Sequence, residues 1–455
     1  MRGPWEGRRL LVAVFVLTLP LVTPRVRGAD EIEYFSYLPS LVLDGDLDFE
    51  NEYRHFHERD PQGLAGFKAT FLDRREPLTG RPINFGPVGS ALLWSPFYLA
   101  AHGAVLGARA LGAAVPADGL SWPYMAAVSL ASAAYALAGL LLVHDAFRRH
   151  TRLGEPALSW ALAALWLGTP LLYYTTLAPA FAHACSLFAV SALLWLWLRA
   201  RASGGARAWA LVGLAGGLCA LVREQDGLFL AVPALDLLWT AAHGGTWRRA
   251  CAAGAAMAAA ALAAFAPQLF VYRALNGTFS PSPLVRRKMD YLSPHALQVL
   301  FDPGHGLFFW SPLLFLAVVG LVVAARRQPS PVGVLFLLAF ALQVWINGAV
   351  ESWSQAGAFG SRRFVAATPL FALGLATVVA WLVASVGRAA TACLLAVFVW
   401  WNASLMVQFG LRLMDRQRLD WPAVAVNQVV EVPPRLARAA WLFFTDRERL
   451  VREAR

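Results

Sequence analysis

Apolar residues occur along this chain in long runs that short polar connections separate. A helix needs about 20 mostly apolar residues to cross a bilayer. Runs near that length lie at 86–112, 123–147, 157–175, 178–198, 207–222, 227–243, 250–272, 307–325, 331–349, 364–386 and 389–409. The pattern therefore predicts an all-α integral membrane protein with 11–13 transmembrane helices.

The first apolar run, 10–23, is shorter than the others. It fits either a first transmembrane span or the apolar region of a secretory signal peptide. Arg25 and Arg27 make a poor cleavage context, so a retained span is the preferred interpretation. Both interpretations place Asp30 outside the cytoplasm.

Basic residues recur at every second connection between the runs. Because cytoplasmic connections are enriched in Lys and Arg, these connections are predicted to be cytoplasmic: Arg148/Arg149/Arg152, Arg199/Arg201/Arg207, Arg248/Arg249, Arg326/Arg327 and Arg388. One stretch breaks the alternation, since two apolar runs lie between the outer segment 28–85 and Arg148, where an odd number of crossings is required. Either the run 86–112 is re-entrant or a crossing is hidden, and the sequence leaves both open.

Long polar segments are expected to gather on one side of the membrane. We divide the chain into a transmembrane domain, 1–409, and an amphipathic C-terminal tail, 410–455. The outer loops 28–85 and 273–306 are far longer than a typical connection of about 4–6 residues, and the first is expected to carry short interfacial helices. A protein built this way is predicted to carry out its function on that face.

Composition narrows the class of protein. Of the 455 residues, 58% are hydrophobic and only 15% are charged, against about 25% in ordinary soluble domains. The formal net charge is +11, which in so apolar a chain indicates membrane orientation and anionic lipid, and the scattered arginines do not indicate nucleic acid. The four cysteines lie in apolar runs without paired spacing, so we expect buried thiols and neither a disulfide nor a zinc site.

Acidic residues follow the first apolar run directly, in Gly28-Ala29-Asp30-Glu31-Ile32-Glu33-Tyr34. Carboxylates at a membrane boundary are costly unless they are solvated, paired or functional. Asp30 and Glu31 are thus candidates for a general base or for oxygen ligands of a divalent cation. A solvated helix start is the alternative. A second acidic run, 44–53, matches a calcium loop poorly, and a hydrogen-bonded turn is preferred there.

Basic residues are also expected on the same outer face. The clusters are Arg81, Arg286 with Arg287, and Arg362 with Arg363. Guanidinium groups bind phosphate bidentately, so these residues indicate an anionic partner, although pairing with the acidic loop is the alternative. His183, Arg223 and His305 also reach this boundary and are secondary candidates, each with a purely structural alternative.

Several motifs taken together resemble those of a known superfamily. They are Asp30-Glu31 after the first span, Arg81-Pro82-Ile83-Asn84-Phe85-Gly86-Pro87 leading into Leu93-Trp94-Ser95-Pro96-Phe97, Phe301-Asp302-Pro303-Gly304-His305-Gly306-Leu307-Phe308, and Phe359-Gly360-Ser361-Arg362-Arg363-Phe364. In their order and spacing the chain resembles bacterial GT-C glycosyltransferases, which use polyprenyl-phosphate-linked sugars. It is similar in plan to protein O-mannosyltransferases and to the lipid A aminoarabinose transferase. The resemblance covers residues 1 to about 386.

The resemblance implies a mechanism and a location. An acidic residue of the first outer loop, here Asp30, would act as base on the acceptor, with Glu31 orienting the acceptor or binding a metal. Arg81, Arg362 and Arg363 would hold the departing lipid phosphate, usually with inversion at the sugar. Metal use varies across the superfamily, so no cofactor is certain and Mg²⁺ or Mn²⁺ is left open. The expected place is the bacterial inner membrane, with the active site facing outward.

Two functions from different classes remain. The first is an enzyme that passes a sugar to a glycan, lipid or protein acceptor, and the second is a transporter or flippase of lipid-linked saccharide. A flippase should carry charges through the depth of its spans, whereas here they cluster at one face, which favours the enzyme. A membrane-lipid environment is expected for both.

Overall fold

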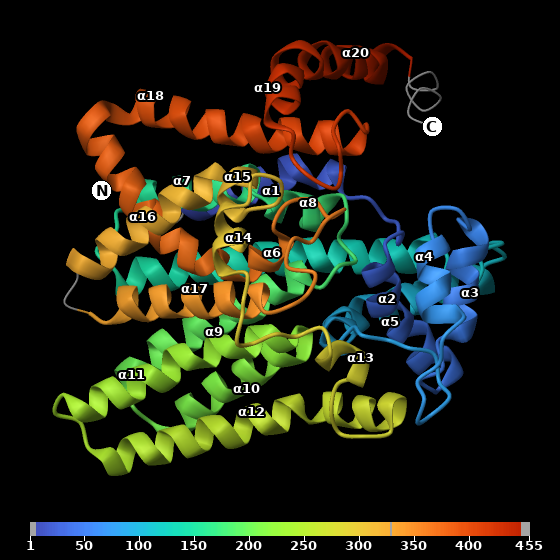
Figure 1. Ribbon diagram of the computed structural model, residues 1–455, viewed down its shortest axis with the longest axis horizontal. Coiled ribbons are helices and arrows are strands. Elements are labelled where there is room, and N and C mark those ends of the chain that lie inside the picture. The colour runs from blue at the N-terminus through green and yellow to red at the C-terminus, as the bar shows by residue number, and fades with distance from the viewer. Residues whose placement is uncertain (1–5, 328–329, 447–455) are drawn as a thin grey trace.

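The computed structural model describes residues 6–327 and 330–446, and every regular element in these ranges is helical (Figure 1). The N-terminal part contains α1 (Glu6–Thr18), η1 (Leu19–Leu21), α2 (Ala29–Pro39), η2 (Ser40–Asp44), α3 (Glu50–Arg59), α4 (Ala65–Phe67), η3 (Lys68–Leu72) and α5 (Gly89–Ala110). The middle contains α6 (Trp122–His150), α7 (Glu155–Gly168), α8 (Pro170–Thr176), α9 (His183–Ser203), α10 (Ala206–Val222), η4 (Glu224–Leu230), α11 (Ala231–Ala242) and α12 (Trp247–Asn276). The remainder contains α13 (Pro283–Arg286), α14 (Ala296–Phe301), α15 (Leu307–Trp310), α16 (Pro312–Arg327), α17 (Val332–Gly348), η5 (Arg362–Ala367), α18 (Thr368–Gly410), α19 (Trp421–Val430) and α20 (Val432–Thr445).

The predicted apolar runs form helices throughout the bundle, but many of these helices are short. Among the described residues, five helices are long and apolar enough to cross a membrane, or six if the bent pair α7–α8 is one span. The helices α10 and α17 are apolar but shorter, and one long helix, α18, covers two predicted runs with a bend at Gly387 (φ 82°). Within the described ranges, fewer helices meet these length and hydropathy criteria than the 11–13 spans that the runs predict, because several runs form shorter or bent helices.

Small residues bring the long helices into close contact. A side chain added at Gly213 of α10 would overlap the carbonyl oxygen of Met257 in α12. One added at Gly374 of α18 would overlap the carbonyl oxygen of Ala317 in α16. Helices in a membrane associate through this kind of backbone approach, because lipid offers no hydrophobic drive between them. The buried faces of the helices form one continuous apolar core.

The polar segments from distant parts of the chain meet at one end of the bundle. Ser282 donates to the Glu76 carboxylate (3.0 Å), which joins the two long loops. The Leu419 amide donates to the Gly304 carbonyl (2.9 Å), which joins the tail to the second loop. In Figure 1 this end, which we call the Asp30 end, carries α2, α3 and α13 at the right, while the α11–α12 connection lies at the left.

Helix α5 begins and ends on the Asp30 side of the bundle. At its start, Gly89 lies against the backbone of Leu221 at the C-terminal end of α10, and the preceding Val88 amide donates to Gln268 near the end of α12 (2.9 Å). Near its middle, Tyr98 donates to the carbonyl of Gly119 in the next loop (3.0 Å), and Gly119 lies beside Pro39 of α2. Of the two sequence alternatives, this arrangement favours a re-entrant 86–112 segment, which leaves α6 as the single crossing before Arg148.

Candidate active site

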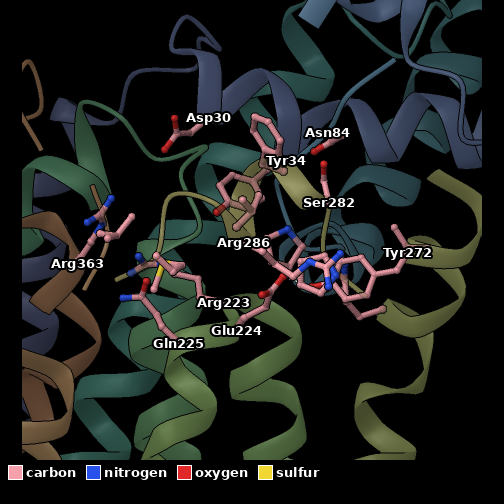
Figure 2. A pocket seen from close by; sticks show the side chains of 18 of the residues that line it. Asp30, Tyr34, Asn84, Arg223, Glu224, Gln225, Tyr272, Ser282, Arg286 and Arg363 are labelled. Atoms are coloured by element: carbon pink, nitrogen blue, oxygen red, sulfur yellow. Dashed lines mark hydrogen bonds between the residues drawn. The ribbon is translucent and has the colours of Figure 1, made fainter. Parts of the chain in front are cut away.

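A cavity of about 480 Å³ opens at the Asp30 end, among α2, the loop before α5, the start of α9, η4, the end of α12, α13 and η5. We call it the Asp30 cavity. Figure 2 shows its side chains converging from these separate segments. Its polar and charged lining residues are Asp30, Tyr34, Tyr37, Asn84, His183, Arg223, Glu224, Gln225, Gln268, Tyr272, Asn276, Ser282, Tyr291, Arg286, Arg362 and Arg363.

Asp30 lies in the first turn of α2, and its carboxylate pairs with the Arg362 guanidinium at 3.0 Å. Gly28 precedes the helix in an extended conformation as its N-cap residue. The Arg362 guanidinium also lies over the Phe181 ring, 4.9 Å from its centre, a geometry that fixes a cation in place. The acidic and basic candidates, which are more than 300 positions apart in the sequence, are therefore in direct contact.

Glu31, the neighbour of Asp30, faces the protein interior. Its Oε2 accepts hydrogen bonds from the backbone amides of Arg27 (3.0 Å) and Gly28 (2.8 Å). Glu31 thus supplies the N3 half of a capping box at the start of α2, where the N-cap residue, Gly28, has no side chain to supply the other half. Burial raises the pKa of Glu31 to about 7, with those two amides opposing the shift. Glu31 does not line the Asp30 cavity, so its position indicates a structural role and not the assisting role expected from the sequence.

Three more basic or imidazole groups line the cavity beside the ion pair. An Arg223 guanidinium nitrogen lies 3.3 Å from Nδ1 of His183. Arg363 donates through Nη2 to the Ser352 hydroxyl (3.0 Å). Its Nη1 is buried and has no hydrogen-bond partner among the described residues. An unsatisfied buried guanidinium donor is costly, and an anionic oxygen entering the cavity would satisfy it.

The cavity lining also carries groups that are typical of hydroxyl recognition. Tyr272 donates to the Glu224 carboxylate, and the Gln225 side chain donates to Asn347 (3.1 Å). Arg286 also lines the cavity. Glu224, Gln225 and Tyr272 were not among the site residues predicted from the sequence. The run Arg223-Glu224-Gln225-Asp226 within an apolar stretch was the signal for the first two; nothing in the sequence marked Tyr272.

Three predicted residues besides Glu31 lie outside the cavity. Arg81 and Arg287 do not line it, and Arg287 is exposed. His305 bonds through Nε2 to the backbone carbonyl of Gln417, so it joins the second loop to the tail. The structure thus brings Asp30, His183, Arg223, Arg286, Arg362 and Arg363 together and leaves Glu31, Arg81, Arg287 and His305 apart from them.

A divalent cation held jointly by Asp30 and Glu31 does not fit this arrangement. The Glu31 carboxylate binds the backbone of its own helix start, and the Asp30 carboxylate pairs with Arg362. In the described ranges, no three His, Cys, Asp or Glu side chains are grouped as a metal site requires.

The fold is similar to that of a solved structure, the crystal structure of ArnT from Cupriavidus metallidurans bound to undecaprenyl phosphate. The TM-score is 0.53 at 17% sequence identity, and the alignment covers 94% of this chain and 75% of that chain. A scan against known protein families finds no match, and neither does a search of curated proteins.

At this identity the likeness shows the fold alone. Together with the apolar helices, it identifies the chain as a multi-pass membrane protein with a GT-C-like fold. The all-α, GT-C-like fold class predicted from the sequence is thereby confirmed.

Proposed function

We propose that this protein transfers a sugar from a polyprenyl-phosphate-linked donor to an acceptor bound in the Asp30 cavity. The observation that carries the proposal is the Asp30–Arg362 pair (3.0 Å) in a cavity that Arg223, Arg286 and Arg363 also line. A carboxylate beside several guanidinium groups supplies a base together with a phosphate-binding site. The fold it shares with ArnT, solved with undecaprenyl phosphate bound, supports a lipid phosphate as the carrier.

The chemical step needs only these groups. The acceptor hydroxyl or amine passes its proton to the Asp30 carboxylate as its oxygen or nitrogen bonds to the anomeric carbon. The bond from that carbon to the phosphate oxygen breaks, and the polyprenyl phosphate leaves with the electron pair. Attack opposite the leaving group inverts the anomeric centre. Guanidinium groups stabilise the charge that develops on the departing phosphate.

Arg362 links donor binding to the readiness of the base. Its guanidinium pairs with the Asp30 carboxylate. A donor phosphate reaching the buried Arg363 Nη1, which has no partner in the described part of the chain, also comes within reach of Arg362. The phosphate then competes for Arg362 and frees Asp30 to accept the proton. In this proposal, the base becomes available only when the leaving group is in place.

The test compares Asp30, which lines the cavity, with its neighbour Glu31, which does not. A deletion strain is complemented with variants, and mass spectrometry follows polyprenyl-linked sugars and surface glycans. Asp30→Asn should leave the lipid-linked sugar accumulated and reduce transfer at least about 100-fold, since a general base contributes about 10²–10⁴. Glu31→Gln should restore transfer, because an amide oxygen can still accept the two backbone hydrogen bonds.

A second matched pair tests the phosphate site. Arg286 and its neighbour Arg287 are both exposed, but only Arg286 lines the cavity. Arg286→Gln should weaken binding of undecaprenyl phosphate to the purified protein roughly tenfold, and Arg287→Gln should leave it unchanged. Wild-type transfer by Asp30→Asn, or equal effects of the two arginine variants, would contradict the proposed site.

A transfer assay with the purified protein separates an enzyme from a flippase. Purified enzyme given lipid-linked sugar and acceptor releases free polyprenyl phosphate and forms a glycosylated product. A flippase moves the intact lipid between leaflets and forms neither.

We place the reaction on the outer side of a bacterial inner membrane, because the basic connections that mark the cytoplasmic side lie away from Asp30. The acceptor class, whether glycan, lipid or protein, is read from the glycan that is lost.

A further inference from the structure

A second cavity, of about 760 Å³, lies at the end of the bundle opposite the Asp30 cavity. It is bounded by the ends of α6, α9 and α11 and by the starts of α10 and α12. We call it the Asp236 cavity. None of its lining residues lines the Asp30 cavity, so the proposed transfer reaction does not account for it.

The charged groups of the Asp236 cavity are mainly basic. Arg201, Arg249 and His150 line it from three helices, against the single carboxylate of Asp236. The Arg201 Nε lies 2.7 Å from the Asp236 Oδ2, and the Arg201 guanidinium also lies over the Trp197 ring. Asp236 and Trp197 therefore hold the Arg201 guanidinium in place. Arg249, at the start of α12, is an exposed cation. Such a cavity favours an anion.

Asp236 adds a second requirement for the ligand. Its side chain is almost fully buried, and its Oδ2 accepts hydrogen bonds from Arg201 and from the Trp197 indole (3.0 Å). Its other oxygen, Oδ1, has no hydrogen-bond partner among the residues that the structure describes. A buried acceptor without a partner is costly. A ligand that combines an anionic group with a hydroxyl or ammonium donor would satisfy both the arginines and this oxygen.

The position of the cavity in the bundle points to a lipid. Trp239 in α11 and Trp247 in α12 are about half exposed (50% and 56%). Tryptophans in such positions are typical of the membrane–water boundary. Basic pockets between helices at that depth recognise phospholipid headgroups. We propose that the Asp236 cavity binds the phosphate-bearing headgroup of a membrane glycerophospholipid, with its hydroxyl or ammonium donor facing Asp236.

The chain offers a matched pair for the test. Arg248 and Arg249 are adjacent and both exposed, but only Arg249 lines the cavity. Phosphatidylglycerol is titrated into delipidated full-length protein, and native mass spectrometry measures the bound fraction. Arg249→Gln should weaken binding roughly fivefold, since a basic residue near the headgroup contributes about that factor, while Arg248→Gln should match the wild type. Inorganic phosphate and glycerol 1-phosphate should fail to displace the lipid at equal concentration.

Three results would overturn the proposal. Equal weakening in the two variants would reduce the site to general surface attraction, and unchanged binding in Arg249→Gln would remove the cavity from lipid binding. Displacement of the lipid by glycerol 1-phosphate at equal concentration would make the ligand a soluble phosphate. The readout is bound lipid and not sugar transfer, so its outcome is independent of the function proposed for the Asp30 cavity.

Discussion

At the scale of single residues, Asp30 and Glu31 show how strongly position decides the chemistry of a carboxylate. The two side chains leave adjacent backbone positions in the first turn of α2, one toward Arg362 and the cavity, the other toward the amides of Arg27 and Gly28. The first is partly exposed and paired with a cation, whereas the second is buried and its pKa is raised to about 7. Only the first lines the Asp30 cavity.

Glu52 is a second buried carboxylate, and it should make stability depend on pH. It lies in α3 with no exposed surface, and burial together with the nearby carboxylates of Asp44 and Asp46 raises its pKa to about 8. Ionising it therefore costs more in the folded than in the unfolded chain, where the pKa is about 4.3. Below pH about 4.3 the neutral side chain costs the folded state nothing. As the pH rises from there through about 8, this part of the folding stability is lost.

Glu52→Gln should remove this loss. The melting temperature of the purified variant should equal that of the wild type near pH 4.5 and exceed it by roughly 2–4 °C at pH 8.5. Glu50→Gln in the same helix is the control, because Glu50 is partly exposed and pairs with Arg54 and with Arg75 (2.8 Å), so that change should bring no gain. A difference between Glu52→Gln and wild type that does not vary with pH would contradict the assignment.

At the scale of elements, glycines decide how closely two helices approach. Helices α16 and α18 meet where Gly374 lies against the carbonyl oxygen of Ala317 and where Gly320 lies against that of Gly374. Backbone atoms cannot move aside as a side chain can, so an added methyl group must push the two helices apart. The close packing of this pair therefore depends on the absence of side chains at these positions.

Gly374→Ala should destabilise the protein by about 1–3 kcal/mol, as overpacking of a close contact does. The measurement is the melting temperature in detergent together with the yield of monodisperse protein. Gly254→Ala is the matched control: Gly254 is also inside a helix, α12, but open space surrounds it. Its replacement should leave stability unchanged or slightly increase it, because alanine favours the helix. Equal losses in both variants would show that the contact is not tight.

At the scale of the whole molecule, the two cavities lie at opposite ends of a bundle whose polar loops are gathered at one of them. Ion pairs at the Asp236 end join separate helices, such as Arg8 with Asp145 (2.8 Å) and Arg201 with Asp236 (2.7 Å). The long loops and the tail bond to one another at the Asp30 end. A membrane therefore meets two chemically different surfaces of the same protein.

Cysteine labelling with a membrane-impermeant reagent tests this arrangement. The background should lack Cys251 and Cys393, which are exposed, contrary to our expectation of four buried thiols; Cys185 and Cys219 are buried. Asp48→Cys and Leu111→Cys should both be labelled from outside intact cells, because α5 begins and ends on the Asp30 side. Gly244→Cys, in the α11–α12 connection, should be labelled only after the membrane is opened. Labelling of Leu111→Cys only in opened cells would show that α5 crosses.

The sequence by itself determined the fold class, because runs of apolar residues near span length leave a helix bundle in lipid as the workable structure. It also indicated Asp30, Arg362 and Arg363 as candidate site residues, since ionisable groups at a membrane boundary usually have a functional role. Only the tertiary structure decided which of them meet. Adjacent residues on a helix point in different directions, so sequence proximity could not separate Asp30 from Glu31 or Arg286 from Arg287. Tyr272 and the Asp236 cavity arise where helices distant in sequence converge, and no local pattern records that convergence.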